Sequence, residues 1–205
     1  MAWFTKQKRS PRRTPLIICK MTPQNIEILK NGGVGVIPTD TIYGLACGAF
    51  NKEALIKLYE LKGRDESKPP VVLISSIEDL KLFGAEITES THNFLKKYWP
   101  GKISIIFTIK TEFSYLDKGM GLAIRLPADK KVLEFLKQTG PLATSSANHQ
   151  AQIPAKNIAE AKRYFNDEVD FYEDGGELDS PPSTLVRING DKVEVLRQGA
   201  VVVSI

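Results

Sequence analysis

The chain has 205 residues, of which 42% are hydrophobic and 25% charged, a composition typical of one globular domain with a substantial core. No apolar run approaches the roughly 18 residues that a membrane-spanning helix needs, so a soluble protein without a membrane partner is expected. Cys19 and Cys47 have no CxxC spacing and no cluster with His92 or His149, which argues against a zinc site or a disulfide framework. This cysteine usage fits a reducing compartment, and we expect the protein in the cytoplasm.

The formal net charge of +4 is concentrated at the N-terminus. The first 20 residues hold six of the 28 basic residues and no acidic residue, so the remainder has 22 basic and 24 acidic residues and a net charge of −2. We expect residues 1–14 to form a basic flexible tail and residues 15–205 to form one catalytic domain. The tail can be a solvated segment, an arm that binds RNA phosphates, or a short organellar presequence.

Helical and strand patterns alternate along the chain. Helices are expected where a capping residue precedes helically spaced apolar residues, as at Thr22 and Asn51, and where glycine follows, as at Gly63. The expected helices run from 23 to a stop at 32–33, from 51 to 63, and over 77–83, 90–98, 130–138 and 155–165. The expected strands cover 16–19, 34–38, 71–74, 103–110, 122–126, 142–143, 169–172, 184–188 and 192–196. A hairpin turn at Asn189-Gly190 makes part of the sheet antiparallel, so the predicted fold class is α/β or α+β, with a largely mixed sheet covered by helices.

Two polar clusters far apart in the chain each lie where a helix or strand ends. Lys62-Gly63-Arg64 offers fixed positive charge for phosphate or carboxylate, and Ser146-Ala147-Asn148 offers short, directional hydrogen bonds. Together they indicate a nucleotide or acyl-phosphate site. We expect Lys62 and Arg64 past the helix end and away from any apolar face. Neither standard phosphate-binding glycine motif is present, and Gly32-Gly33-Val34-Gly35 precedes a strand, so we interpret it as a helix stop.

Three further segments place polar groups at strand ends or within a strand. Thr39-Asp40-Thr41 follows a buried strand and either forms a turn through its own backbone or belongs to a site. Arg125 lies in an apolar strand, where it either meets an anion or is exposed on an edge strand. Residues 144–148 follow a short strand with hydroxyl groups, although a plain turn would look similar.

Seven motifs in a fixed order connect these segments. They read Pro-Thr-Asp-Thr-x-Tyr-Gly-Leu, Lys-x-Arg-x-x-x-Lys-Pro, Trp-Pro-Gly, Ile-Arg-x-Pro, Ser-x-Asn, Ser-Thr-x-Val and Leu-Arg-x-Gly, and they extend from about Thr22 to Val201. In this order the chain resembles the YrdC-like threonylcarbamoyl-AMP synthase family, in its short, single-domain form. The resemblance implies a twisted mixed sheet curved around a large open cavity. It also implies a nucleotidyltransferase that forms threonylcarbamoyl-AMP and pyrophosphate from L-threonine, bicarbonate or CO2, and ATP.

The resemblance also implies partners and roles for individual residues. The product would supply other proteins that transfer the threonylcarbamoyl group to adenosine 37 of tRNA, and tRNA itself is a possible partner. Mg²⁺ is expected to arrive mainly with ATP, with no firm protein ligand set. By motif, the catalytic residues would be Lys62, Arg64, Ser146 and Asn148. The threonine contacts would be Thr41, Arg125 and Ser183, and the nucleotide contacts would be Arg64, Lys68, Thr144, Ser146, Pro154 and Arg197.

The chain departs from the family pattern at three places. Gln150-Ala151 stands where the family usually has Ser-Gly, Gln198 replaces a proline after Arg197, and Arg187 stands where Asp is common. These departures concern loop geometry more than chemistry. Two rival functions stay open: a non-catalytic RNA-binding or ribosome-maturation protein, and a carbamoyl-transfer module of the hydrogenase-maturation type.

Overall fold

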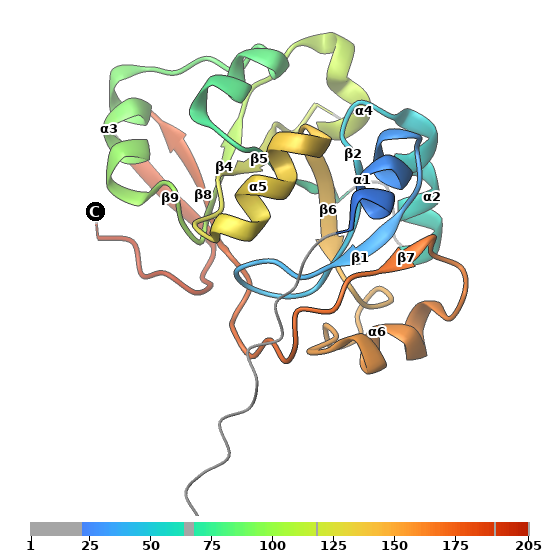
Figure 1. The fold of residues 1–205 in the computed structure, drawn as a ribbon. Helices are drawn as coiled ribbons and strands as arrows, with labels where there is room; N and C mark the ends of the chain where they lie inside the picture. Colours follow the sequence, from blue (N-terminus) through green and yellow to red (C-terminus); the bar gives the residue numbers. More distant parts are fainter. Residues whose placement is uncertain (1–21, 64–67, 118, 191, 205) are drawn as a thin grey trace, which may run out of the picture.

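A nine-stranded mixed sheet runs through the whole computed structural model, in the order β7-β1-β2-β6-β3-β5-β4-β8-β9 (Figure 1). The structure describes residues 22–63, 68–117, 119–190 and 192–204. The strands are β1 (Gly35–Ile37), β2 (Gly44–Gly48), β3 (Val71–Leu73), β4 (Ile103–Phe107), β5 (Leu122–Arg125), β6 (Leu142–Ser146), β7 (Phe171–Tyr172), β8 (Thr184–Asn189) and β9 (Lys192–Arg197). The pairs β1/β7, β3/β5 and β4/β8 are parallel and the other neighbours are antiparallel, so the predicted mixed sheet is confirmed.

The helices begin and end largely where capping residues predict. They are α1 (Pro23–Lys30), α2 (Lys52–Lys62), α3 (Glu89–Tyr98), α4 (Ser114–Asp117), α5 (Lys130–Thr139) and α6 (Ile158–Phe165), with the 3₁₀ helices η1 (Ile77–Phe83) and η2 (Thr111–Phe113). Thr22 accepts a hydrogen bond from the Asn25 amide, and Asn51 accepts one from the Ala54 amide. Gly63 ends α2 with φ of 57°, a left-handed conformation that glycine adopts without steric cost.

Several sequence-based boundaries are wrong. Residues 44–48 form β2 between β1 and β6, a strand that is absent from the expected set. Strand β6 extends to Ser146, so the hydroxyls of residues 144–146 belong to the strand and do not follow it. In the hairpin, Asn189 pairs with Lys192 and is the last strand residue, so the turn starts at Gly190. The strand expected over 16–19 lies outside the described residues.

Helices cover the two faces of the sheet unequally. One face packs on α2, α3 and α6 through alternate strand residues such as Leu45, Val72 and Ile124. The other face packs on α1 and α5 through a second core cluster that includes Leu73 and Leu142. Figure 1 shows α1 and α5 on the near side of the sheet, over the part of the sheet that includes β1, β2 and β6. The same face is open beyond these two helices, toward β4 and β8.

Candidate active site

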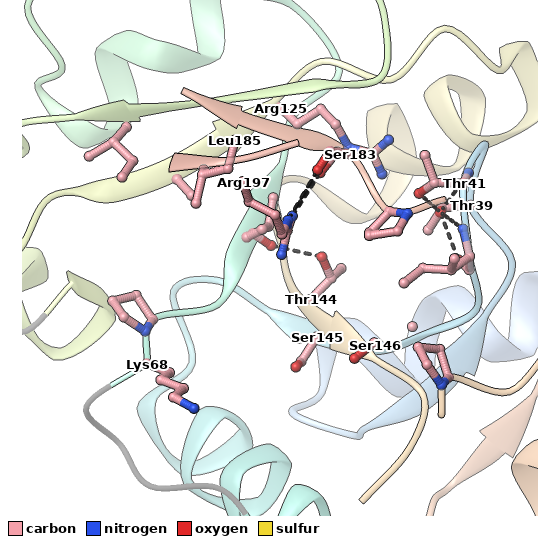
Figure 2. Close-up of a pocket in the computed structure, with 18 of the residues that line it drawn as sticks. Thr39, Thr41, Lys68, Arg125, Thr144, Ser145, Ser146, Ser183, Leu185 and Arg197 are labelled. Carbon is pink, nitrogen blue, oxygen red and sulfur yellow. Dashed lines mark hydrogen bonds between the residues drawn. The ribbon is translucent and has the colours of Figure 1, made fainter. Parts of the chain in front are cut away.

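A cavity of about 460 Å³ occupies the open part of this sheet face (Figure 2). Its floor includes one in-register row across five strands, formed by Thr144, Val71, Ala123, Ile106 and Arg187. Residues paired in register point to the same face of a sheet, which explains why segments far apart in sequence meet here. The row has a hydroxyl at one end, apolar side chains in the middle and a guanidinium at the other end. A second cavity of about 530 Å³ adjoins the first and shares the wall residues Ile106, Met120, Gly121 and Arg187.

Arg125, which lines this cavity, forms a buried ion pair with Asp40. Arg125 ends the interior strand β5, and its side chain is 4% exposed, so the alternative of an exposed edge-strand arginine is wrong. Its Nη1 donates to Oδ1 of Asp40 at 2.5 Å, and Asp40 Oδ2 accepts the Ala128 amide at 3.2 Å. Burial lowers the pKa of Arg125 against the opposing effect of Asp40. The anion that the sequence required for Arg125 is therefore present within the protein.

Arg197 and Ser183 line the same cavity as Arg125. The guanidinium of Arg197 donates from Nη2 to the Ser183 carbonyl at 2.9 Å and from Nε to the same oxygen at 3.3 Å. The Ser183 hydroxyl lies 2.8 Å from the buried hydroxyl of Ser104 on β4. Burial, and then the nearby charge of Arg125, lower the pKa of Arg197. The local charge of these two guanidinium groups exceeds that of the one carboxylate, which favours an anionic ligand.

Lys62 is the last residue of α2 and is buried, so the expectation that it lies past the helix end is wrong. Its Nζ donates to the Ser146 carbonyl at 2.6 Å, to the Ser146 hydroxyl at 2.9 Å and to Asn148 Oδ1 at 2.5 Å. Asn148 in turn donates from Nδ2 to the carbonyls of His149 and Gln152. The lysine thus fixes the end of β6 and the following loop to the C-terminus of α2.

The loop between β1 and β2 is organised by hydroxyl groups. Thr39 Oγ1 donates to the Ile42 carbonyl at 2.7 Å and accepts the amides of Thr41 and Ile42, which is the turn chemistry that the sequence offered as one alternative. Thr41 nevertheless lines the cavity. The hydroxyl of the fully buried Tyr43 accepts the Gly175 amide and donates to the Gly176 carbonyl, and so fixes the long loop before β8.

Most of the predicted site residues meet in one place. The cavity is lined by Thr41, Lys68, Arg125, Thr144, Ser146, Pro154, Ser183 and Arg197. Lys62 and Asn148 do not line it and lie behind Ser146 as its support. Thr144 donates its hydroxyl to the Val71 carbonyl at 2.8 Å, which leaves its oxygen as an acceptor. Arg64 lies outside the described residues.

Sequence reasoning missed polar residues of two kinds: Ser145 and Arg187 line the cavity, and Asp40 and Ser104 bind residues that line it. Asp40 was considered only with its threonine neighbours, and its pairing with Arg125 joins residues 85 positions apart. Ser104 gave no signal, because a single serine in an apolar strand is unremarkable. The available signal was that Ser104 is a polar residue at an inward position of a strand, next to the strand that follows Ser183.

Within the described residues, no group of three His, Cys, Asp or Glu side chains is placed to hold a metal ion. No helix in the same part of the chain is long and apolar enough to cross a membrane.

Fold and cavity together define an α/β protein whose open sheet face holds a cavity lined by arginine, lysine and hydroxyl side chains. The profile of the Sua5/YciO/YrdC family, described as "Telomere recombination", matches residues 27–199. The chain therefore belongs to the Sua5/YciO/YrdC family, and the predicted resemblance is confirmed. A putative threonylcarbamoyl-AMP synthase of Mycobacterium tuberculosis is 30% identical over 176 residues, which cover 84% of this chain and 81% of the relative. Relatives of this name are nucleotidyltransferase-type enzymes, and the prediction of an enzyme of this type is confirmed.

Solved structures of Sua5 from P. abyssi share the fold. A variant of that protein superposes with a TM-score of 0.80 at 26% identity, covering 85% of this chain and 55% of the Sua5 chain. The same protein complexed with L-threonine gives a TM-score of 0.77 at 25% identity, covering 85% and 52%. The present chain thus spans about half the length of these Sua5 chains.

Proposed function

We propose that this protein is an L-threonylcarbamoyladenylate synthase. It takes L-threonine, bicarbonate or CO2, and MgATP, and it forms threonylcarbamoyl-AMP and pyrophosphate. The observation that carries the proposal is the cavity itself, in which Arg125, Arg197 and Lys68 meet a set of hydroxyl groups. Support also comes from the relatives named threonylcarbamoyl-AMP synthase and from the Sua5 structure with bound L-threonine.

The proposed reaction joins a carbamate to the nucleotide. The threonine amine and bicarbonate give an N-carboxylated threonine with loss of water. An oxygen of this carbamate attacks the α-phosphorus of ATP, the bond from that phosphorus to the bridging oxygen of the β-phosphate breaks, and pyrophosphate leaves. This displacement requires alignment and charge neutralisation more than a protein nucleophile. Arginine and lysine side chains and the Mg²⁺ that accompanies ATP supply that positive charge.

The site residues are proposed to form two groups, one for threonine and one for the nucleotide. Arg125, Thr41 and Ser183 are proposed to bind threonine, and Lys68, Thr144, Ser146, Pro154 and Arg197 to bind the nucleotide. Lys62 and Asn148 act by holding Ser146 in place, as their hydrogen bonds to it and to each other suggest. Arg64 is proposed to contact phosphate on the basis of its motif alone. The product is proposed to pass to proteins that modify adenosine 37 of tRNA.

The decisive assay measures pyrophosphate release from ATP with and without threonine and bicarbonate. We expect release only when both are present, together with a product of the mass of threonylcarbamoyl-AMP. Serine in place of threonine serves as the matched control for the amino acid. Pyrophosphate release that ignores threonine, or no release while the protein binds structured RNA, would reject the proposal and favour the RNA-binding alternative.

A further inference from the structure

The Asp40–Arg125 pair joins two separate segments of the chain, and the Ala128 amide also binds Asp40. Asp40 comes from the loop between β1 and β2, and Arg125 comes from the end of β5. The two side chains are 7% and 4% exposed. The second carboxylate oxygen of Asp40 accepts the amide of Ala128, which follows β5. The orientation of Asp40 is therefore fixed independently of Arg125, and the guanidinium is oriented by the carboxylate.

One nitrogen donor of Arg125, Nε, makes no hydrogen bond within the described part of the protein. Its Nε is buried and has no hydrogen-bond partner among the described residues. An unpaired buried donor is unfavourable, so such an atom at a cavity indicates a ligand that completes it. Because Asp40 engages Nη1, the edge of the guanidinium that has no partner among the described residues is the one formed by Nε and Nη2. Two parallel N–H groups on that edge match the two oxygens of a carboxylate.

The charges around the pair favour a further anion. Arg197 is close enough to Arg125 for their charges to interact, and Lys68 and Arg187 also line the cavity. No acidic side chain is present among the described residues that line it. Figure 2 draws the nitrogen atoms of Arg125 between Ser183 and the turn of Thr39 and Thr41, which all line the same cavity. A ligand at the free edge of Arg125 would thus also meet hydroxyl groups.

We propose that Asp40 is a positioning residue of the site, which holds Nη1 of Arg125 so that the Nε and Nη2 edge receives the carboxylate of the amino-acid substrate. The inference rests on the proposed function and adds a residue to it. It differs from a model in which Asp40 merely occupies Arg125 until the substrate displaces it. Under displacement, removing the charge of Asp40 would strengthen substrate binding, whereas under positioning it weakens binding.

The test compares Asp40→Asn with Asp129→Asn. Asp129 caps α5 from an exposed position close in sequence to Ala128, and asparagine is an equally good cap, so this control should behave as wild type. For Asp40→Asn we expect the KM for L-threonine to rise about tenfold or more, with kcat at saturating threonine within about twofold and the Kd for ATP without threonine unchanged. Calorimetry should show that the variant no longer distinguishes L-threonine from L-threoninamide, which lacks the carboxylate.

Other results would overturn the inference. An unchanged or lower KM for threonine in Asp40→Asn would exclude positioning, and a parallel fall in kcat and ATP affinity would show a general structural role. If the wild-type chain does not bind threonine at all, the proposed function falls and this inference with it. If the wild type binds threonine and Asp40→Asn binds it equally well, only the inference falls.

A second comparison covers the case in which a lone buried Arg125 prevents folding. Arg125→Met and the double variant Asp40→Asn with Arg125→Met both lack the buried positive charge, and the double variant also removes the carboxylate that Arg125→Met leaves buried and unpaired, so it should be the more stable of the two. Because Asp40 acts through Arg125, adding Asp40→Asn to Arg125→Met should not raise the threonine KM further. An additional rise of tenfold would contradict the proposed route of action.

Discussion

The ammonium group of Lys62 acts as a structural centre for the end of β6. It donates hydrogen bonds to two oxygens of Ser146 and to Asn148 Oδ1 from a buried position. A charge-assisted hydrogen bond is roughly twice as strong as a neutral one, and its loss leaves buried acceptors unpaired. Lys62 therefore couples the stability of the chain to the geometry of the cavity wall.

Replacing Lys62 by methionine keeps most of the side-chain volume and removes every donor. We expect the free energy of unfolding to fall by about 1–3 kcal/mol, because Ser146 and Asn148 lose their partner. Pyrophosphate release should fall with it, since Ser146 lines the cavity. Urea denaturation followed by fluorescence, and the pyrophosphate assay, measure the two effects.

The matched control is Lys57→Met in the same helix. Lys57 forms an ion pair with Asp170 in which both side chains are more than a third exposed, and such pairs contribute at most about 1 kcal/mol. Wild-type stability and activity in Lys62→Met would show that the Ser146–Asn148 segment is held by other contacts.

Ala151 has a backbone conformation that favours glycine. Its φ is 66°, in the left-handed region, at the position where the family pattern usually has glycine. The Cβ of an alanine in this conformation approaches the neighbouring carbonyl oxygen, at a cost of about 1 kcal/mol. The alanine thus takes the backbone conformation that glycine favours, with strain at this residue.

We expect Ala151→Gly to raise the free energy of unfolding by about 0.5–1 kcal/mol, after the added flexibility of the unfolded chain is subtracted from the relieved strain. The exposed side chain makes a loss of packing small. Chemical denaturation measures the change. The same substitution at Ala159, exposed within α6, should lower stability by about 1 kcal/mol. If both substitutions changed the free energy of unfolding in the same direction, Ala151 would not be strained.

At the scale of elements, the segment after β9 is fastened to the start of β8. The hydroxyl of Thr184 donates to the Val201 carbonyl at 2.6 Å and accepts the amides of Gly199 and Val201. The Ala200 amide donates to the Pro182 carbonyl. A Cβ on Gly199 would collide with the backbone of Pro182 and Ser183. This explains physically the glycine of the Leu-Arg-x-Gly motif: the two chains approach too closely for any side chain.

Gly199→Ala should therefore separate the two segments and displace Arg197 and Ser183, which lie in them. We expect a loss of roughly 1–3 kcal/mol in unfolding free energy and a clear fall in threonine-dependent pyrophosphate release. Gly48→Ala is the control, because a Cβ there would make only ordinary contacts with Leu29 and Asn51. If both variants behave alike, the close approach at Gly199 is not a constraint on the site.

Asp170 links three elements, since its Oδ2 accepts the Val34 amide at 2.7 Å and the Lys57 ammonium at 2.8 Å shortly before β7. Partial burial raises its pKa, but the bonds from Lys57 and Val34 outweigh this effect and the net pKa is lowered. A lowered carboxyl pKa gives stability that is present above the unfolded-state value near 3.8 and is lost as the pH falls through the folded-state value.

We expect Asp170→Asn to be less stable than wild type at pH 7 by about 0.5–1 kcal/mol, a modest figure because solvent screens this half-exposed pair. The difference should shrink below pH 4 and vanish once the wild-type carboxyl is protonated. Denaturation series at pH 7 and at pH 3 test this. A difference that does not depend on pH would assign the effect to packing instead of charge.

At the scale of the whole molecule, local signals predicted most elements and the general content of the site. Caps such as Thr22 and Asn51 and the apolar spacing of α2 act within a few residues, so the sequence shows them directly. The position of β2 between β1 and β6, the 3₁₀ geometry of η1 and the partner of Arg125 depend on contacts between distant segments. Motif order brought Arg125 and Ser183 to one site, but only the hydrogen bonds between distant segments show Asp40 and Ser104 beside them.

The N-terminal segment differs in charge from the rest of the chain, which carries more acidic than basic residues. Residues 1–13 carry five basic residues and no acid, and they lie outside the described residues. Deleting them should leave threonine-dependent pyrophosphate release unchanged, because the described residues that line the cavity all lie between Thr39 and Arg197. Any tRNA binding should weaken, most clearly at low salt, because phosphate contacts are screened by salt.

Gel-shift titrations at two salt concentrations, together with the pyrophosphate assay, measure both effects. A full-length chain in which the five basic residues are replaced by glutamine separates charge from length. A large loss of catalysis in either form would mean that the tail takes part in the reaction.

The cavity draws its lining residues from seven strands, β2 to β6, β8 and β9, and this lining extends from Thr39 to Arg197. No short fragment of the chain contains all of these residues, so ligand binding in the cavity requires the completed sheet. Any molecule that fills the cavity selects the folded state and stabilises it by about 2.7 kcal/mol at a free concentration of one hundred times its Kd. In a cell where the substrates are abundant, their supply would therefore also govern how long each copy of the protein survives proteolysis.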